Sequence, residues 1–197
     1  MITLCMDTSH VFLCTAFIKD DKVLVSEQKE CWKKQSEELF PSLVSLCDEA
    51  SISVDDIDQV VISKGPGSYT GVRIAMTVGK VLCASKHLPL YTVGTMQLYA
   101  GMDPVRVVLD ARGKRVYTCK YENGIALEEE RAVYIDDIAD LVQNEVLVGD
   151  SHLFGREDQW PDIAQHFLDL MDLWHFEENV DLVVPEYLKT SEAYLTK

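Results

Sequence analysis

The chain has 197 residues and a formal net charge of −15, from 33 acidic and 18 basic side chains. This balance disfavours a protein that binds nucleic acid by itself, because lysines and arginines must replace the phosphate counterions. Six cysteines form no C-x-x-C pair, which argues against a zinc knuckle or a thioredoxin-like motif. With no basic leader and no run of about 18 uncharged apolar residues, we expect a cytoplasmic protein without membrane association.

The apolar patterns of the first half predict alternating strands and helices. Short apolar runs predict strands at residues 2–6, 11–18, from 23, at 59–63 and at 90–93. Apolar residues at every third or fourth position predict helices at residues 36–50, 72–86 and 95–100. We expect Pro41 to kink the first of these helices or to delay its start. Three antiparallel strands followed by alternating helix and strand are typical of the ribonuclease-H-like arrangement.

The second half begins with strands again but is shorter. Its patterns predict strands at residues 105–109, 115–121, 125–133 and 146–148, the middle two joined by an Asn123-Gly124 turn. They predict helices at residues 136–142 and 162–173, and a short one from Glu186. We therefore predict an α/β protein of two lobes, residues 1–102 and an abbreviated C-terminal lobe of residues 103–197.

Two segments could bind phosphate. Asp7-Thr8-Ser9 closes the first predicted strand, where a carboxylate and two hydroxyls can position a metal-bound water or a phosphate. A plain turn explains the same residues. The Gly65–Gly71 loop leads into a helix that Ser68 or Thr70 can cap, and a helix N-terminus attracts anions. The loop lacks the Gly-Lys-Ser/Thr of a Walker A motif, and a tight loop with a helix cap explains it equally well.

Small residues on the helix after this loop, at Ala75, Gly79, Cys83 and Ala84, would let another helix approach closely. That helix is either internal, at residues 39–47, or part of a partner. The histidines show no metal-binding spacing, so we predict no metal ligands. Asp110 with Arg112 is either a catalytic pair or a strand-end salt bridge, and no catalytic constellation emerges.

Four segments, in order along the chain, resemble the TsaB/YeaZ family. Met6-Asp7-Thr8-Ser9 resembles its I-D-T-S opening, and residues 65–73 resemble its G-P-G-S-[FY]-T-G-[LV]-R stretch. Asp110-Ala111-Arg112 with Val116-Tyr117 resembles its D-A-R-x-x-E-V-Y segment, and residues 185–189 resemble its P-x-Y-L-R segment. Gln35-Ser36 and Lys114-Arg115 depart from the family pattern.

The resemblance implies an actin/Hsp70/sugar-kinase (ASKHA) fold and a non-catalytic scaffold in tRNA N6-threonylcarbamoyladenosine synthesis. It implies a heterodimer with TsaD, with the ATPase TsaE joining a larger complex and tRNA contacted mainly through these partners. A homodimer is an alternative state. An ATPase or small-molecule kinase of the same fold is the alternative function, and nothing favours a protease.

We take the first two long helices as the partner-binding surface, with Leu39, Leu43, Leu46, Arg73, Ala75, Met76, Gly79 and Cys83 as its residues. We expect no cofactor in the chain itself, and at most a nucleotide at the complex interface. The residues that would contact a nucleotide or phosphate are Asp7, Thr8, Ser9, Gly65, Gly67 and Ser68.

Overall fold

The computed structural model describes residues 1–31 and 33–188, and these form two β-sheets with helices around and between them. The first sheet has the strand order β11-β5-β4-β1-β2-β3. Its strands are β1 (Ile2–Asp7), β2 (Phe12–Lys19), β3 (Lys22–Glu30), β4 (Gln59–Ser63), β5 (Leu90–Val93) and β11 (His175–Phe176).

The pairing within this sheet is that of a ribonuclease-H-like fold. β1 pairs antiparallel with β2 and parallel with β4, so that Leu4 lies opposite Phe17 on one side and Val60 on the other. β4 then pairs parallel with β5. β1 and β4 are buried almost throughout, as expected for central strands covered on both faces. The predicted fold class is confirmed.

The second sheet has the strand order β10-β6-β7-β8, with β9 also pairing with β7. β10, β6 and β7 are paired in the same way as β4, β1 and β2 of the first sheet. Its strands are β6 (Val105–Arg112), β7 (Arg115–Glu122), β8 (Ile125–Ala126), β9 (Arg131–Tyr134) and β10 (Leu147–Gly149). Within the described residues, β10 is the single strand parallel to β6. The second half is therefore an abbreviated version of the first.

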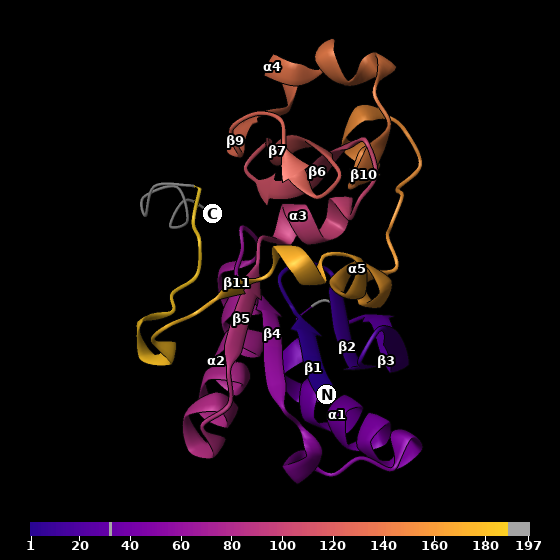
Figure 1. The fold of residues 1–197 in the computed structure, drawn as a ribbon. Coiled ribbons are helices and arrows are strands. Elements are labelled where there is room, and N and C mark those ends of the chain that lie inside the picture. The colour runs from indigo at the N-terminus through magenta and orange to yellow at the C-terminus, as the bar shows by residue number, and fades with distance from the viewer. Residues whose placement is uncertain (32, 189–197) are drawn as a thin grey trace.

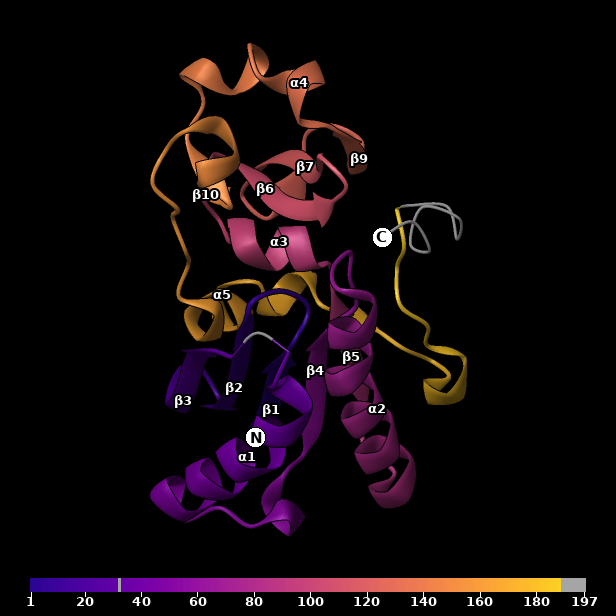
Figure 2. The same ribbon diagram turned by 180° about the vertical axis from the view of Figure 1, so that it is seen from behind.

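The helices form layers with the sheets (Figure 1). α1 (Gln35–Ala50) and α2 (Tyr69–Lys86) cover the outer face of the first sheet. Figure 2 shows from behind that α3 (Thr95–Ala100) and α5 (Ile163–Asp169) lie between the two sheets. One apolar core there contains Cys14 and Leu109 from the two sheets and Tyr99 and Phe167 from the two helices. The short helix α4 (Ile135–Ile138) and a smaller core cover the far face of the second sheet.

The last part of the chain returns to the first sheet. β11 pairs antiparallel with β5, and the side chain of Gln28 in β3 bonds to the start of α5. Its amide donates to the Pro161 carbonyl at 2.9 Å and accepts from the Ile163 N–H at 2.8 Å. The lobe boundary at residues 102 and 103 stays a prediction, but residues after 160 pack with the first half.

Several predicted elements differ in detail. α1 continues through Pro41 without a break. The predicted strand 125–133 is divided into β8 and β9, since the intervening Glu128 turns to pair with the buried Arg106. The predicted helix 136–142 is divided: α4 ends at Ile138, and a 3-10 turn follows at Leu141–Asn144, where the Arg156 side chain bonds the carbonyls of residues 142 and 143. The helix expected from Glu186 does not begin by residue 188, and residues 189–197 lie outside the described part.

No helix in the described part of the chain combines the length and apolar character that crossing a membrane requires.

Candidate functional site

Asp7 ends β1 with a fully buried carboxylate that neutral groups of the protein surround. Its Oδ1 accepts from the Ser9 N–H at 3.0 Å, from the Ser9 hydroxyl at 2.5 Å and from the Ser63 hydroxyl. The Tyr99 hydroxyl lies 3.4 Å from Oδ2. Burial and the Asp7 charge together raise the pKa of Tyr99 well above its ordinary value. The hydrogen bonds from Ser9, Ser63 and Tyr99 replace the water that the buried Asp7 carboxylate has lost. The Asp7 side chain therefore holds the turn together.

The glycine loop closes directly over this turn. The Ser68 N–H donates to the Ser9 carbonyl at 2.7 Å. The Thr8 hydroxyl donates to the Gly71 carbonyl at 2.7 Å and accepts from the Ala75 N–H at 3.0 Å. A Cβ at Gly67 would lie closer than 3.0 Å to the Ser9 carbonyl oxygen, and one at Gly71 would do the same with Thr8. The glycines therefore let two backbone segments of this chain touch.

Of the six residues predicted to contact a nucleotide, Asp7, Ser9, Gly67 and Ser68 contact one another, and Thr8 bonds to the first turn of α2. Of the two caps predicted for α2, Ser68 or Thr70, the structure has Ser68. Its hydroxyl accepts from the Gly71 N–H at 3.2 Å. The hydroxyls of Thr8 and Ser9 are also engaged within the protein. Gly65 lies against the Glu186 backbone, at the other end of the loop. Nucleotide binding by these residues stays a prediction.

The C-terminal motif joins the same structure. The Glu186 N–H donates to the Lys64 carbonyl at 2.7 Å, and the Lys64 and Glu186 side chains form an ion pair at 2.8 Å. Tyr187 stacks on Tyr69 with 5.6 Å between ring centroids, and the Arg73 Nε donates to the Tyr187 hydroxyl at 2.9 Å. Lys189, the last residue of this motif, lies outside the described residues. Arg73, expected to meet a partner, therefore holds the C-terminal segment on α2.

The Asp110 segment lies on the other side of the turn and connects the two sheets. Its N–H donates to Oδ2 of Asp150 at 2.5 Å, and the same oxygen forms a 2.8 Å ion pair with the imidazole of His10. Burial raises the pKa of Asp150, but His10 and the Asp110 N–H outweigh it and hold this pKa below its ordinary value. Asp110 and Arg112 form an ion pair at 3.8 Å beside the β6–β7 turn, the strand-end alternative considered above.

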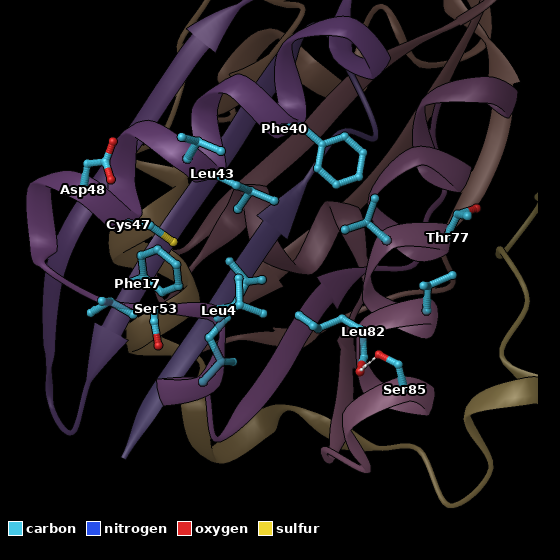
Figure 3. A pocket seen from close by; sticks show the side chains of 16 residues that line it. Leu4, Phe17, Phe40, Leu43, Cys47, Asp48, Ser53, Thr77, Leu82 and Ser85 are labelled. Carbon is cyan, nitrogen blue, oxygen red and sulfur yellow. Dashed lines mark hydrogen bonds between the residues drawn. The ribbon is translucent and has the colours of Figure 1, made fainter.

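An apolar groove of about 540 Å³ separates α1 from α2. Its floor includes Leu4 and Phe17 of the first sheet (Figure 3). Its walls include Phe40, Val44 and Val81, whose exposed fractions are 60%, 60% and 64%. Large exposed apolar side chains gathered around one hollow mark an interaction site, because a monomer rarely leaves such a surface in water.

The structure corrects the residues expected to form the docking surface. The members that lie in the core of this chain are Leu39, Leu46, Ala75, Met76, Gly79 and Cys83. Gly79 faces β4 and β5, where its Cβ position is 3.1 Å from Ile62, so the close approach is to the sheet and not to another helix. Burial also raises the pKa of Cys83 to about 11. Leu43 alone among the expected residues lines the groove.

Other groove residues on the two helices were not predicted to bind a partner, and these include Phe40, Val44, Val78 and Val81. The sequence does contain a signal for these groove residues. Each helix has a second apolar stripe, with a spacing of four residues on α1 and of three residues on α2. Ser63 and Tyr99, which contact Asp7, were also missed. They lie on β4 and α3, and no sequence spacing connects them with the turn.

Comparison with known proteins connects this geometry to a family. The sequence model described as "TsaD: tRNA N6-adenosine threonylcarbamoyltransferase" matches residues 26–152. The TsaB protein of Bacillus subtilis is 33% identical over 132 residues, which are 64% of this chain and 58% of that protein. TsaB of Escherichia coli is 27% identical, over 77% of this chain and 71% of its own length.

A solved structure described as YeaZ from Pseudomonas aeruginosa superposes with a TM-score of 0.76 at 20% identity. The match covers 95% of this chain and 99% of that one, so the two share their whole fold. The family model covers more than half of the chain, and the segments that carry the resemblance meet around the Asp7 turn. The chain therefore belongs to the TsaB/YeaZ family, within the wider family that the TsaD sequence model describes.

Proposed function

We propose that this chain takes part in tRNA threonylcarbamoyladenosine biosynthesis as a non-catalytic subunit that docks onto a TsaD-type protein. The pathway is supported by the relatives from Bacillus subtilis and Escherichia coli, both described as tRNA threonylcarbamoyladenosine biosynthesis protein TsaB. The matched region spans just over half of the first of these proteins, so its role is carried over here as part of the proposal.

The closed Asp7 turn supports the non-catalytic part of the proposal. A phosphate-binding loop presents free backbone N–H groups and hydroxyls to its ligand. Here the Ser68 N–H and the Thr8 and Ser9 hydroxyls are engaged with other parts of the chain. The space between the sheets holds α3, α5 and their buried side chains. Both features fit a scaffold better than an ATPase or kinase.

The α1–α2 groove is the observation that carries the docking proposal. Its lining is apolar apart from Asp48, Ser53, Thr77 and Ser85, and its most exposed members stand on the rims of both helices. A partner that inserts an apolar helix or helix pair would cover both rims at once. The net charge of −15 disfavours direct tRNA binding, so in this proposal TsaD supplies the RNA contacts, with TsaE joining the larger complex.

The test is complex formation between the purified full-length chain and the TsaD-type protein of the same organism, by size-exclusion chromatography with light scattering. Val81→Glu puts a charge on the groove rim, where Val81 is 64% exposed and the folded chain tolerates the change. Changing one important interface residue often reduces the free energy of binding by about 2 kcal/mol or more. We therefore expect Val81→Glu to bind the TsaD-type protein at least tenfold more weakly.

Val146→Glu is the matched control, because Val146 is 67% exposed and precedes β10 on the second sheet. We expect this variant to bind like the unmodified chain. The molar mass of the chain alone measures whether two copies associate. The molar mass of Val81→Glu measures whether such an association uses the groove. Equal binding by all three proteins would refute the docking surface, and no complex with the unmodified chain would refute the TsaD partnership.

A further inference from the structure

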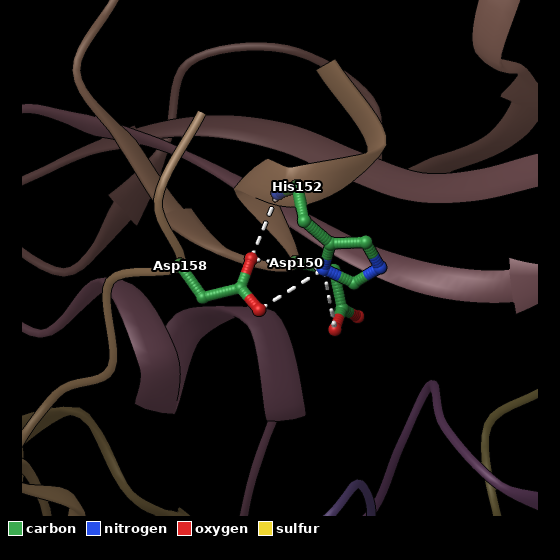
Figure 4. A group of neighbouring side chains, drawn as sticks. All are labelled: Asp150, His152 and Asp158. Carbon is green, nitrogen blue, oxygen red and sulfur yellow. Dashed lines mark hydrogen bonds and ion pairs between the residues drawn. The ribbon is translucent and has the colours of Figure 1, made fainter. Parts of the chain in front are cut away.

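The loop after β10 gathers three side chains that could ligate a metal ion. Asp150 follows β10 directly, His152 lies in the short 3-10 helix of residues 151–154, and Asp158 comes six residues later. One ligand atom from each lies within 4.8 Å of the other two, and their side chains converge from three sides (Figure 4).

The two carboxylate oxygens of Asp150 have different surroundings within residues 1–31 and 33–188. Its side chain is 6% exposed, and its Oδ2 receives both the Asp110 N–H and the His10 imidazole. Oδ1 faces the His152 ring, with Nδ1 at 4.0 Å. Oδ1 is not among the buried polar atoms of the described residues that lack a partner, so it keeps contact with solvent, and a bound ion could replace water there.

Asp158 and His152 provide the other ligand atoms at a suitable spacing. His152 Nδ1 lies 2.9 Å and 3.0 Å from the two Asp158 oxygens. Neighbouring ligands of an octahedral ion with bonds of about 2.1 Å lie about 3.0 Å apart, and opposite ligands about 4.2 Å apart. The 4.0 Å between His152 and Asp150 thus fits opposite positions. His152 is 56% exposed, which leaves the cluster open to solvent.

We propose that Asp150, His152 and Asp158 form a binding site for a divalent transition-metal ion of the cobalt and zinc class. A mixed set of one imidazole and two carboxylates suits these ions, whereas magnesium and calcium prefer sites made of oxygen alone. Water would complete the coordination on the exposed side. The site is distinct from the α1–α2 groove and does not depend on the docking proposal.

A structural role explains part of this cluster but not all of it. Asp158 also accepts the His152 N–H at 2.8 Å, which alone would place it at the turn. That bond does not involve Oδ1 of Asp150, which lies 4.0 Å from the ring nitrogen. A bound ion would tie the loop to Asp150 and, through His10 and Asp110, to the turns at the ends of β1 and β6. We therefore expect the ion to stabilise the junction between the two sheets.

The test is titration of the chelator-treated full-length chain with Co²⁺, followed by calorimetry and absorption spectroscopy. Co²⁺ is chosen because binding to any of the six cysteines would give intense thiolate charge-transfer absorption, which imidazole and carboxylate ligands do not give. We expect one ion per chain without that absorption, displacement by Zn²⁺, and a rise in the unfolding temperature with Co²⁺ concentration.

Asp158→Asn keeps an oxygen that can accept the His152 N–H, and His152→Ala keeps the backbone donor, so both variants should fold. We expect each to bind Co²⁺ at least tenfold more weakly and to lose the rise in unfolding temperature. Asp172→Asn and His175→Ala are matched controls at exposed positions outside the cluster, and should bind normally. Thiolate absorption, no binding at millimolar Co²⁺, or unchanged binding by both site variants would overturn the proposal.

Discussion

Substituting Gly67 by alanine tests whether the glycine loop serves the fold or a ligand. The added Cβ would lie closer than 3.0 Å to the Ser9 carbonyl oxygen and 3.1 Å from the Ser9 carbonyl carbon. Backbone atoms cannot rotate away as a side chain can, so the loop must move. The movement would strain the packing, at about 1–3 kcal/mol, and weaken the bond from the Ser68 N–H, at about 1 kcal/mol. We expect a total loss of about 2–4 kcal/mol in the free energy of unfolding.

Gly79→Ala is the control, since it makes the same chemical change in a different environment. Its Cβ would lie 3.1 Å from the Cγ2 methyl group of Ile62, a side-chain atom that can shift by a few tenths of an ångström. The gain of about 1 kcal/mol in helix propensity offsets this contact, so we expect a change within about 1 kcal/mol. Urea unfolding at equilibrium, with unchanged slopes as the check for two-state behaviour, measures both variants. A Gly67→Ala protein as stable as the Gly79→Ala protein would refute this explanation of the loop.

Two further predictions concern pH. Burial raises the pKa of Glu130 in the folded state. The contribution of the Glu130 side chain to the free energy of unfolding is therefore fully present below about pH 4.3, the ordinary value. It is lost as the pH rises through the higher pKa of the folded state. Glu130→Gln should therefore be more stable than the unmodified chain at pH 7.5 and lose this advantage at pH 4, in urea unfolding at both values. The hydrogen bond and charge of the buried Arg106 lower the pKa of Glu128, so its contribution is present above about pH 4.3 and is lost as the pH falls through the folded-state value. Glu128→Gln should accordingly be less stable than the unmodified chain at pH 7, with a smaller difference at pH 3; an equal difference at both values would contradict the ion pair as the cause.

Local sequence patterns were sufficient to predict most of the first sheet and the two long helices that cover it. Its strands are continuous apolar runs, and the helices have a clear apolar repeat. β11 was missed since a strand of two residues has no period, and it exists only because β5 offers an open edge. The predicted single strand at 125–133 failed for a related reason. Its division depends on Arg106, about twenty residues earlier, whose buried guanidinium requires the Glu128 carboxylate.

The docking face was expected on the two helices that flank the groove but mostly on the wrong residues, since of the eight expected only Leu43 lines the groove. Helical periodicity identified an apolar face containing Ala75 and Gly79, but the same repeat arises whether the face meets a sheet or a partner. The structure assigns that face to the sheet and leaves Phe40 and Val81 on the rims of the groove. The Asp150, His152 and Asp158 cluster has spacings of two and six residues, which match no metal motif.

The core between the sheets has a consequence for how the protein can be divided. Its buried members come from both halves of the chain, and α5 and β11 complete the packing of strands formed long before them in the sequence. A fragment ending at residue 102 would leave the inner face of the first sheet in water, with Cys14 and Tyr99 uncovered. The two halves should thus exchange their core amide hydrogens in one cooperative event. The strand pairing of the two halves is similar, yet the shared core makes them one folding unit.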